Sequence, residues 1–107
     1  MSKRVDIAGG SGQSYSFMPL DGEAYLRPIG VTYLIAEKLG QGWRVLQVGE
    51  TNNLAQRDWE PRLEAVRREH PSAELLIRLN VSRSIRAAEA ADIAAAPRGG
   101  PPGDQRD

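Results

Sequence analysis

The 107-residue sequence predicts one small domain of mixed α/β (α+β) class. We expect a three-stranded antiparallel sheet flanked by helices, preceded by an N-terminal β-hairpin. Two observations predict this class: from residue 31 onward, segments with strand and helix character follow in the order β, β, α, α, β, α, and the chain is long enough to bury one modest core. The expected parts are a hairpin and connection at 1–28, the main domain at 29–96 and a disordered tail at 97–107.

The N-terminal hairpin is predicted from period-two alternation. Apolar and polar residues alternate over 3–8 and again over 14–18, and a glycine-rich stretch at 9–13 separates them. Such a stretch can also bind phosphate, but no Lys-Ser or Lys-Thr pair follows these glycines. We therefore expect a hairpin loop here.

The second pair of strands is expected at 31–37 and 43–49, because a short glycine-containing turn joins two apolar runs. Alternation along the second strand puts Gln47 on the same face as Trp43 and Val45. A glutamine on an apolar face needs hydrogen-bond partners if it is buried.

Two helices are expected after these strands. Thr51 or Asn52 can cap a short helix near 53–59. A second helix is expected near 61–70, because Pro61 is favoured at the first helical position. At its end, the single histidine, His70, is expected to be a surface residue that caps the helix favourably through the helix dipole.

The last elements are a third strand at 73–81 and a helix at 82–96, with Ser82 as its cap. The spacing of Glu89 puts its carboxylate on the apolar stripe of this helix, with Ile85, Ala88 and Ile93. A carboxylate facing a core is costly unless it binds a metal or forms an ion pair. Both alternatives stay open, and Arg86 is the nearest candidate partner.

Composition excludes several classes of function. Fourteen basic and fourteen acidic residues give a formal net charge of zero, which argues against a surface that attracts nucleic acid everywhere. The absence of cysteine excludes disulfides, thiolate metal sites and cysteine nucleophiles. No apolar run has the length of a signal peptide or of a membrane span, so we expect a cytoplasmic protein.

Four motifs, taken in order, resemble those of the GIY-YIG nuclease superfamily. They are VTYLI at 31–35, QVGET at 47–51, NNLAQR at 52–57 and AAEAADI at 87–93. The resemblance covers about residues 29–95, and VGETNNLAQR is its most specific part. In this chain Gln47 stands where the family has its second tyrosine.

The resemblance implies a metal-dependent endonuclease that hydrolyses phosphodiester bonds, most readily in DNA. It implies that Glu89 holds one Mg²⁺ or Mn²⁺ ion, that Tyr33 helps activate the attacking water and that Arg57 stabilises charge on the phosphate. Gln47 counts among the catalytic residues, because its amide can donate a hydrogen bond in place of the phenol. Nucleic-acid binding is assigned to Thr51, Asn53 and Arg62.

Two other interpretations remain open. In the first, the domain is a degenerate GIY-YIG module that binds nucleic acid or a protein without cleavage; Arg57 and Glu89 then form an internal ion pair, and Gln47 is a structural hydrogen-bonder. In the second, an unrelated α+β domain shares one strand–helix turn by chance. Family nucleases often gain specificity from a separate DNA-binding domain, so we expect a partner or a structured substrate to supply it here. The sequence leaves the oligomeric state open.

Overall fold

The computed structural model of the protein describes residues 4–20, 26–40 and 42–96. The predicted disordered tail therefore lies outside the described residues. The elements in chain order are β1 (Val5–Ala8), β2 (Ser14–Pro19), β3 (Val31–Leu39), β4 (Gly42–Thr51), the 3₁₀ helix η1 (Leu54–Gln56), α1 (Glu60–Arg67), β5 (Glu74–Leu79) and α2 (Arg83–Ala94).

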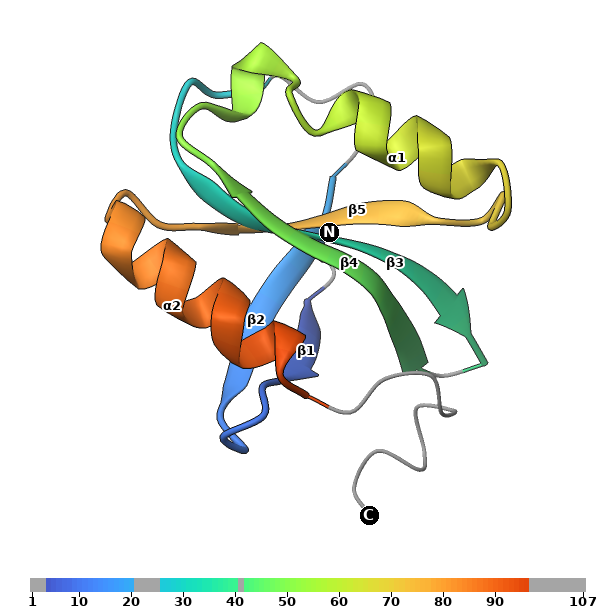
Figure 1. Cartoon of the computed structure of the whole chain (residues 1–107), viewed down its shortest axis with the longest axis horizontal. Helices are drawn as coiled ribbons and strands as arrows, with labels where there is room; N and C mark the ends of the chain where they lie inside the picture. The colour runs from blue at the N-terminus through green and yellow to red at the C-terminus, as the bar shows by residue number, and fades with distance from the viewer. Residues whose placement is uncertain (1–3, 21–25, 41, 97–107) are drawn as a thin grey trace.

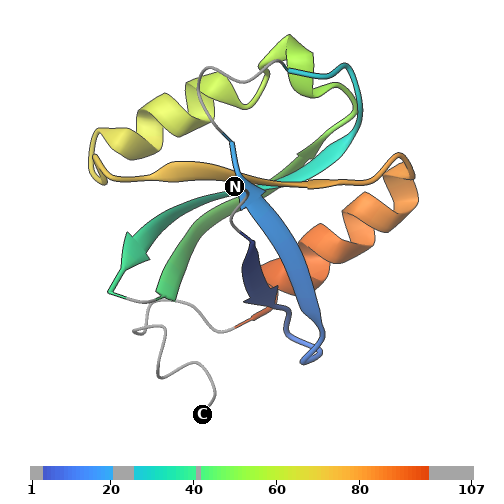
Figure 2. The same ribbon diagram turned by 180° about the vertical axis from the view of Figure 1, so that it is seen from behind.

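All five strands belong to one antiparallel sheet with the order β1-β2-β5-β3-β4. The predicted α+β class is confirmed, but the prediction of three strands was an undercount. The N-terminal hairpin joins the sheet because Met18 pairs with Ile77 and Pro19 with Leu76. This contact is short, and β2 then runs steeply across β5 (Figures 1 and 2). The hairpin is therefore part of the sheet and not an appendage to it.

The two α-helices cover opposite faces of the sheet, as Figures 1 and 2 show from both sides. Each face has its own apolar cluster. The cluster under α1 consists of Val31, Tyr33, Ile35, Leu54, Trp59, Leu63, Val66, Ala73, Leu75 and Ile77. The cluster under α2 consists of Val5, Ile7, Tyr15, Phe17, Leu34, Ala36, Val45, Leu76 and Ile93.

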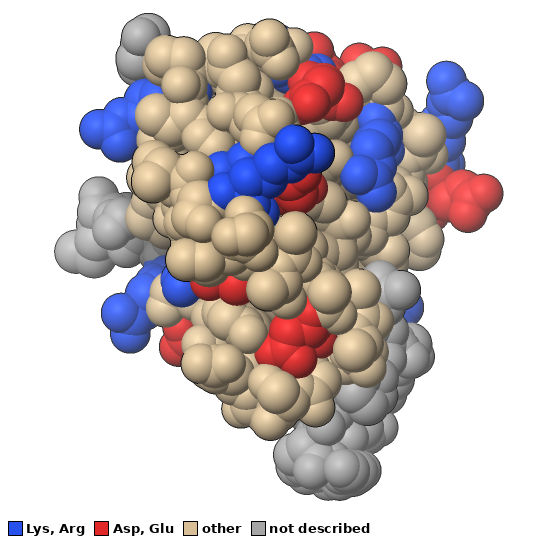
Figure 3. Space-filling view, turned by 60° about the vertical axis from the view of Figure 1, so that its left-hand side comes forward, with Lys and Arg blue, Asp and Glu red and all other residues tan. Residues whose placement is uncertain are grey.

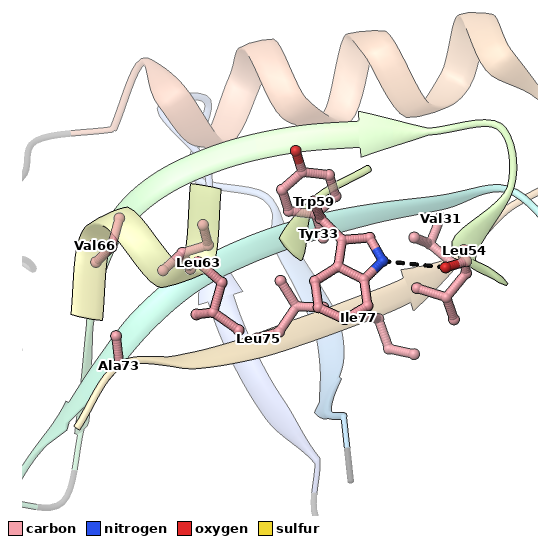
Figure 4. Packing of buried hydrophobic residues seen from close by; sticks show 10 residues of the cluster. Val31, Tyr33, Leu54, Trp59, Leu63, Val66, Ala73, Leu75 and Ile77 are labelled. Carbon is pink, nitrogen blue, oxygen red and sulfur yellow. Dashed lines mark hydrogen bonds between the residues drawn. The ribbon is translucent and has the colours of Figure 1, made fainter. Parts of the chain in front are cut away.

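Trp59 fills the centre of the α1 cluster. Figure 4 shows its indole beside Tyr33 and Ile77. The side chain is only 4% exposed, and its Nε1–H donates to the carbonyl of Leu54 over 3.1 Å. Burying a large aromatic surface and satisfying its polar atom stabilise the same packing arrangement. Trp59 thus ties η1 and the start of α1 to the sheet.

A β-bulge at Leu46 changes which residues of β4 share a face. Ile35 pairs with Gln47, whereas the next residue of β3, Ala36, pairs with Val45. The extra residue reverses the alternation of side chains along the strand. Gln47 therefore lies on the face covered by α1, while Val45 packs in the cluster under α2. The prediction that these two residues share a face was wrong for this reason.

The predicted helix near 53–59 is the short η1 followed by a turn. Its cap is Asn53, whose side chain accepts a hydrogen bond from the backbone N–H of Ala55 over 3.0 Å, and not Thr51 or Asn52 as predicted. Arg57 ends η1 in the left-handed conformation, with φ 58°. The chain thus turns between η1 and α1.

The later helices follow the sequence signals more closely. Pro61 lies in the first turn of α1, and the hydroxyl of Ser82 caps α2 by accepting from the N–H of Ile85 over 3.3 Å, as predicted. Within the described ranges, no helix has both the length and the apolar character required to cross a membrane.

Candidate ligand-binding corner

One polar corner forms where α1 passes over β3 and β4. It consists of Tyr33, Gln47, Gly49 and Arg62, and we call it the Arg62 corner. The sheet register places Tyr33 directly opposite Gly49, and Arg62 reaches down from the first turns of α1. Two of the predicted catalytic residues, Tyr33 and Gln47, are thereby brought together with one predicted nucleic-acid-binding residue.

The guanidinium of Arg62 holds this corner together. Its Nη1 donates to the hydroxyl of Tyr33 over 2.7 Å, its Nε donates to Oε1 of Gln47 over 3.0 Å, and its Nη2 lies 3.5 Å from the carbonyl oxygen of Val48. The guanidinium carbon also lies 5.5 Å from the centre of the Tyr33 ring. Arg62 is nevertheless solvent-exposed. Because arginine carries five N–H donors, the group retains donors for a ligand.

Gly49 is required for this close packing. A Cβ atom at this position would lie 2.5 Å from Cζ of Tyr33 and 2.7 Å from Nη1 of Arg62. Tyr33 is 3% exposed and has little room to move aside. The glycine of the VGET motif therefore has a packing reason to be present, whatever the chemistry of the site.

Arg57 lies apart from this corner. Its guanidinium pairs with Glu60 over 3.4 Å and lies 5.9 Å from the ring centre of Trp59. Arg57 also lines a hollow of about 570 Å³ that is bounded by residues of α1 and β5, such as Leu63 and Leu75. The structure therefore does not bring Arg57 together with Tyr33 and Gln47.

Thr51 and Asn53 support the turn that leads into η1. The hydroxyl of Thr51 accepts from the N–H of Asn53 and lies 3.0 Å from Oδ2 of Asp58. Thr51 is 3% exposed, and the side-chain oxygen of Asn53 caps η1. Both polar groups already have partners within the protein.

Glu89 faces the sheet, as its position on the helix predicted, but it does so on the face opposite Tyr33. Its two carboxylate oxygens accept from Nε and Nη2 of Arg78 over 3.1 and 3.3 Å. Neither predicted ion pair of Glu89, with Arg86 or with Arg57, is present. Ile85, expected to be buried beside it, is 49% exposed.

The surroundings of Glu89 do not fit a divalent cation in this arrangement. Both oxygens that would bind Mg²⁺ or Mn²⁺ are occupied by Arg78, and the residue is only 8% exposed. Among the described residues, no three His, Cys, Asp or Glu side chains are grouped so that they could hold a metal ion. We therefore derive no chemical step through a metal.

A row of polar side chains, three residues apart on α2, fixes this helix to the sheet. Arg86 donates to Glu50 of β4 over 2.9 Å, Glu89 accepts from Arg78 of β5, and Asp92 accepts from the hydroxyl of Tyr15 of β2 over 2.7 Å. Each position reaches a different strand. Periodicity in the sequence predicted that Glu89 faces the sheet. It did not predict the partners on the strands, because these depend on the order of the strands in the sheet.

Asp92 makes this row sensitive to acid. The hydroxyl of Ser11, the hydroxyl of Tyr15 and the backbone N–H of Ser11 donate to Asp92 and hold the pKa of its carboxyl below the usual 3.8. Because the folded pKa is lowered, these bonds stabilise the fold above pH 3.8, and this contribution is lost as pH falls through the folded pKa.

Urea unfolding of the wild type and Asp92→Asn should therefore show a stability difference at pH 6 that shrinks below pH 4. A difference that stays constant over this range would contradict this role.

His70 forms a contact that the sequence did not predict. Its Nδ1 lies 3.1 Å from Oε2 of Glu37, a buried carboxylate near the end of β3, and Arg44 pairs with the other oxygen over 3.5 Å. His70 is therefore a partly exposed side chain that links the turn after α1 to the β3–β4 hairpin, a contact that the predicted surface cap did not include. The sequence held one signal for this contact: alternation along β3 puts Glu37 on the same face as Tyr33 and Ile35, where a carboxylate needs a partner.

Comparison of the chain with protein-family models, curated protein sequences and solved structures found no match. The relation to the GIY-YIG superfamily is therefore a resemblance in sequence motifs, carried chiefly by residues 48–57.

Proposed function

We propose that this domain binds nucleic acid, most readily DNA, through the Arg62 corner and does not cleave it. The observation that carries the proposal is the separation of the two groups that cleavage would join. The exposed guanidinium of Arg62 is fixed by Tyr33 and Gln47 on one face of the sheet. The carboxylate of Glu89 is bonded to Arg78 on the other face.

A fixed arginine suits a phosphate group. Its planar donors match phosphate oxygens, and the bonds from Tyr33 and Gln47 restrict the side chain before a ligand arrives. Binding then costs less side-chain entropy than it would for a freely moving arginine.

The rest of the surface predicts modest affinity. Figure 3 shows basic and acidic side chains interspersed on one face, without a continuous basic surface there. Along α1 and the turn that follows it, exposed Arg62, Arg67 and Arg68 are interspersed with exposed Glu64 and Glu69. Interspersed carboxylates offset the attraction of the backbone phosphates. We therefore expect binding that is weak and that weakens further with added salt.

Replacing Arg62 tests this proposal. Arg62→Gln removes one charge-assisted phosphate contact, so affinity for a labelled oligonucleotide at low salt should fall about tenfold or more. The slope of log affinity against log salt should decrease by about one. Fluorescence anisotropy measures both quantities.

Arg83→Gln is the matched control, because it removes the same charge from an exposed position on α2. Its effect on affinity should be small. Equal losses in the two variants would mean that binding depends on total charge, and the proposed role of the Arg62 corner would then be wrong.

A second candidate function is the metal-dependent endonuclease implied by the resemblance. One observation favours it: the Tyr33 hydroxyl and the Gln47 amide lie beside a cationic group, and phosphodiester hydrolysis needs polar groups near the developing charge. A supercoiled-plasmid nicking assay at low salt, with Mg²⁺ and then Mn²⁺, tests it. We expect no nicking by the wild type. Nicking that disappears in folded Glu89→Gln and Glu89→Ala variants would replace the binding proposal with the nuclease.

A further inference from the structure

A hollow of about 330 Å³ lies beside the Arg62 corner, between β4 and the C-terminal half of α1. Its lining residues are Leu46, Gln47, Ala65, Val66, Glu69 and His70. Gln47 belongs both to this hollow and to the corner, so a ligand on Arg62 lies next to the opening. Pockets of this size with apolar walls and a few polar groups are typical of small-molecule sites.

The hydrogen bonds already made by two of these residues determine what they can offer. Oε1 of Gln47 accepts from Arg62, which leaves the amide N–H groups of Gln47 as donors. Nδ1 of His70 lies 3.1 Å from one carboxylate oxygen of Glu37, and Arg44 pairs with the other oxygen over 3.5 Å. In the tautomer that carries its proton on Nδ1, the ring of His70 donates to this carboxylate, and its Nε2 is an acceptor.

Glu69 adds a second acceptor. Its carboxylate is exposed at the hollow and disfavours a phosphate there. The same residues favour a neutral ring that carries an amino group. The amine can donate to Glu69 or His70, while a ring nitrogen or carbonyl accepts from Gln47. The side chains of Val66 and Ala65 provide apolar contact for such a ring.

We propose that this hollow receives an unpaired nucleobase with an exocyclic amine, adenine or cytosine, from a single strand whose phosphate lies on Arg62. This inference rests on the proposed function and narrows it to a ligand class. A base inside a duplex is stacked and paired, so a single strand presents it at a far lower cost. Glutamine and carboxylate side chains are suited to reading amino-bearing bases by their hydrogen-bond pattern.

The test uses three thymidine nonamers that differ only at the central position, which holds adenine, thymine or an abasic site. Fluorescence anisotropy at low salt and pH 7.5 should show about tenfold tighter binding of the adenine strand than of the other two. Glu69→Gln should reduce this preference several-fold, because a neutral amide oxygen accepts a hydrogen bond more weakly than a carboxylate. Glu64→Gln is the matched control, since it removes one carboxylate from an exposed position on α1, outside the hollow, and should keep the preference.

The possible failures are distinguishable. Equal affinity of the wild type for all three strands, with Arg62→Gln weakening each of them, would overturn the base pocket and leave the proposed function standing. Affinities that Arg62→Gln does not change would overturn both. An equal reduction of the adenine preference in Glu64→Gln would assign the effect to net charge and overturn the base pocket.

Discussion

Arg86→Ala is expected to lower the free energy of unfolding by about 3 kcal/mol. Arg86 is 2% exposed and donates to Glu50 over 2.9 Å, to the carbonyl of Asn80 over 2.8 Å and to the side chain of Asn52. Truncation leaves the Glu50 carboxylate, itself mostly buried, without its cation. Urea unfolding followed by circular dichroism measures the change.

Two further variants separate this effect from general loss of charge. Arg83→Ala, one turn earlier and exposed, should change stability by less than about 0.5 kcal/mol. Gly30→Ala should reproduce part of the Arg86 effect, because a Cβ there would lie 2.1 Å from Nη1 of Arg86. If Arg86→Ala is as stable as Arg83→Ala, the buried guanidinium does not hold α2 on the sheet.

Trp59→Ala is expected to lower the free energy of unfolding by about 3–5 kcal/mol. The substitution leaves a cavity under α1 next to Tyr33 and Ile77, and it leaves the carbonyl of Leu54 without its indole donor. The same urea titration measures it. Trp59→Phe is the control: it keeps most of the apolar contact and loses the hydrogen bond, so it should cost clearly less. Equal losses in both variants would show that the hydrogen bond, and not the packing, accounts for the stability.

Local signals in the sequence predicted the elements themselves. Alternation and turn glycines placed the strands, and the Ser82 cap placed the start of α2. Two features depend on contacts between distant segments and left no local signal: the pairing of β2 with β5, and the bulge at Leu46. The bulge shows the size of the effect, because one extra residue puts Val45 and Gln47, which were expected on one face, on opposite faces of the sheet.

The candidate site was predictable to a smaller extent. The sequence singled out Tyr33, Gln47 and Arg62, which the structure brings together. It also marked Glu89 as an inward-facing carboxylate, but it could not name Arg78 as the partner. The partner of a buried charge is set by which strand lies beneath the helix, and that order arises only in the assembled sheet.

The separation of Tyr33 and Glu89 has a simple origin. Tyr33 pairs with Ile77 and lies under α1, whereas Arg78, the next residue of β5, points to the other face and meets Glu89 on α2. Because neighbouring residues of a strand face opposite sides, one step along β5 separates the two sites. The motif order that resembles the nuclease superfamily is therefore compatible with a binding role at the corner alone.

The most direct measurement is a ¹H–¹⁵N correlation spectrum of the labelled protein, recorded while an unlabelled single-stranded oligonucleotide is added at low salt. We expect the largest shift changes at the backbone of Gly49, the side-chain amide of Gln47 and the Nε–H of Arg62. Resonances of Arg78 and Glu89 should change little. Changes concentrated at Arg78 and Glu89 under α2, with the Arg62 corner unaffected, would contradict the proposed binding site.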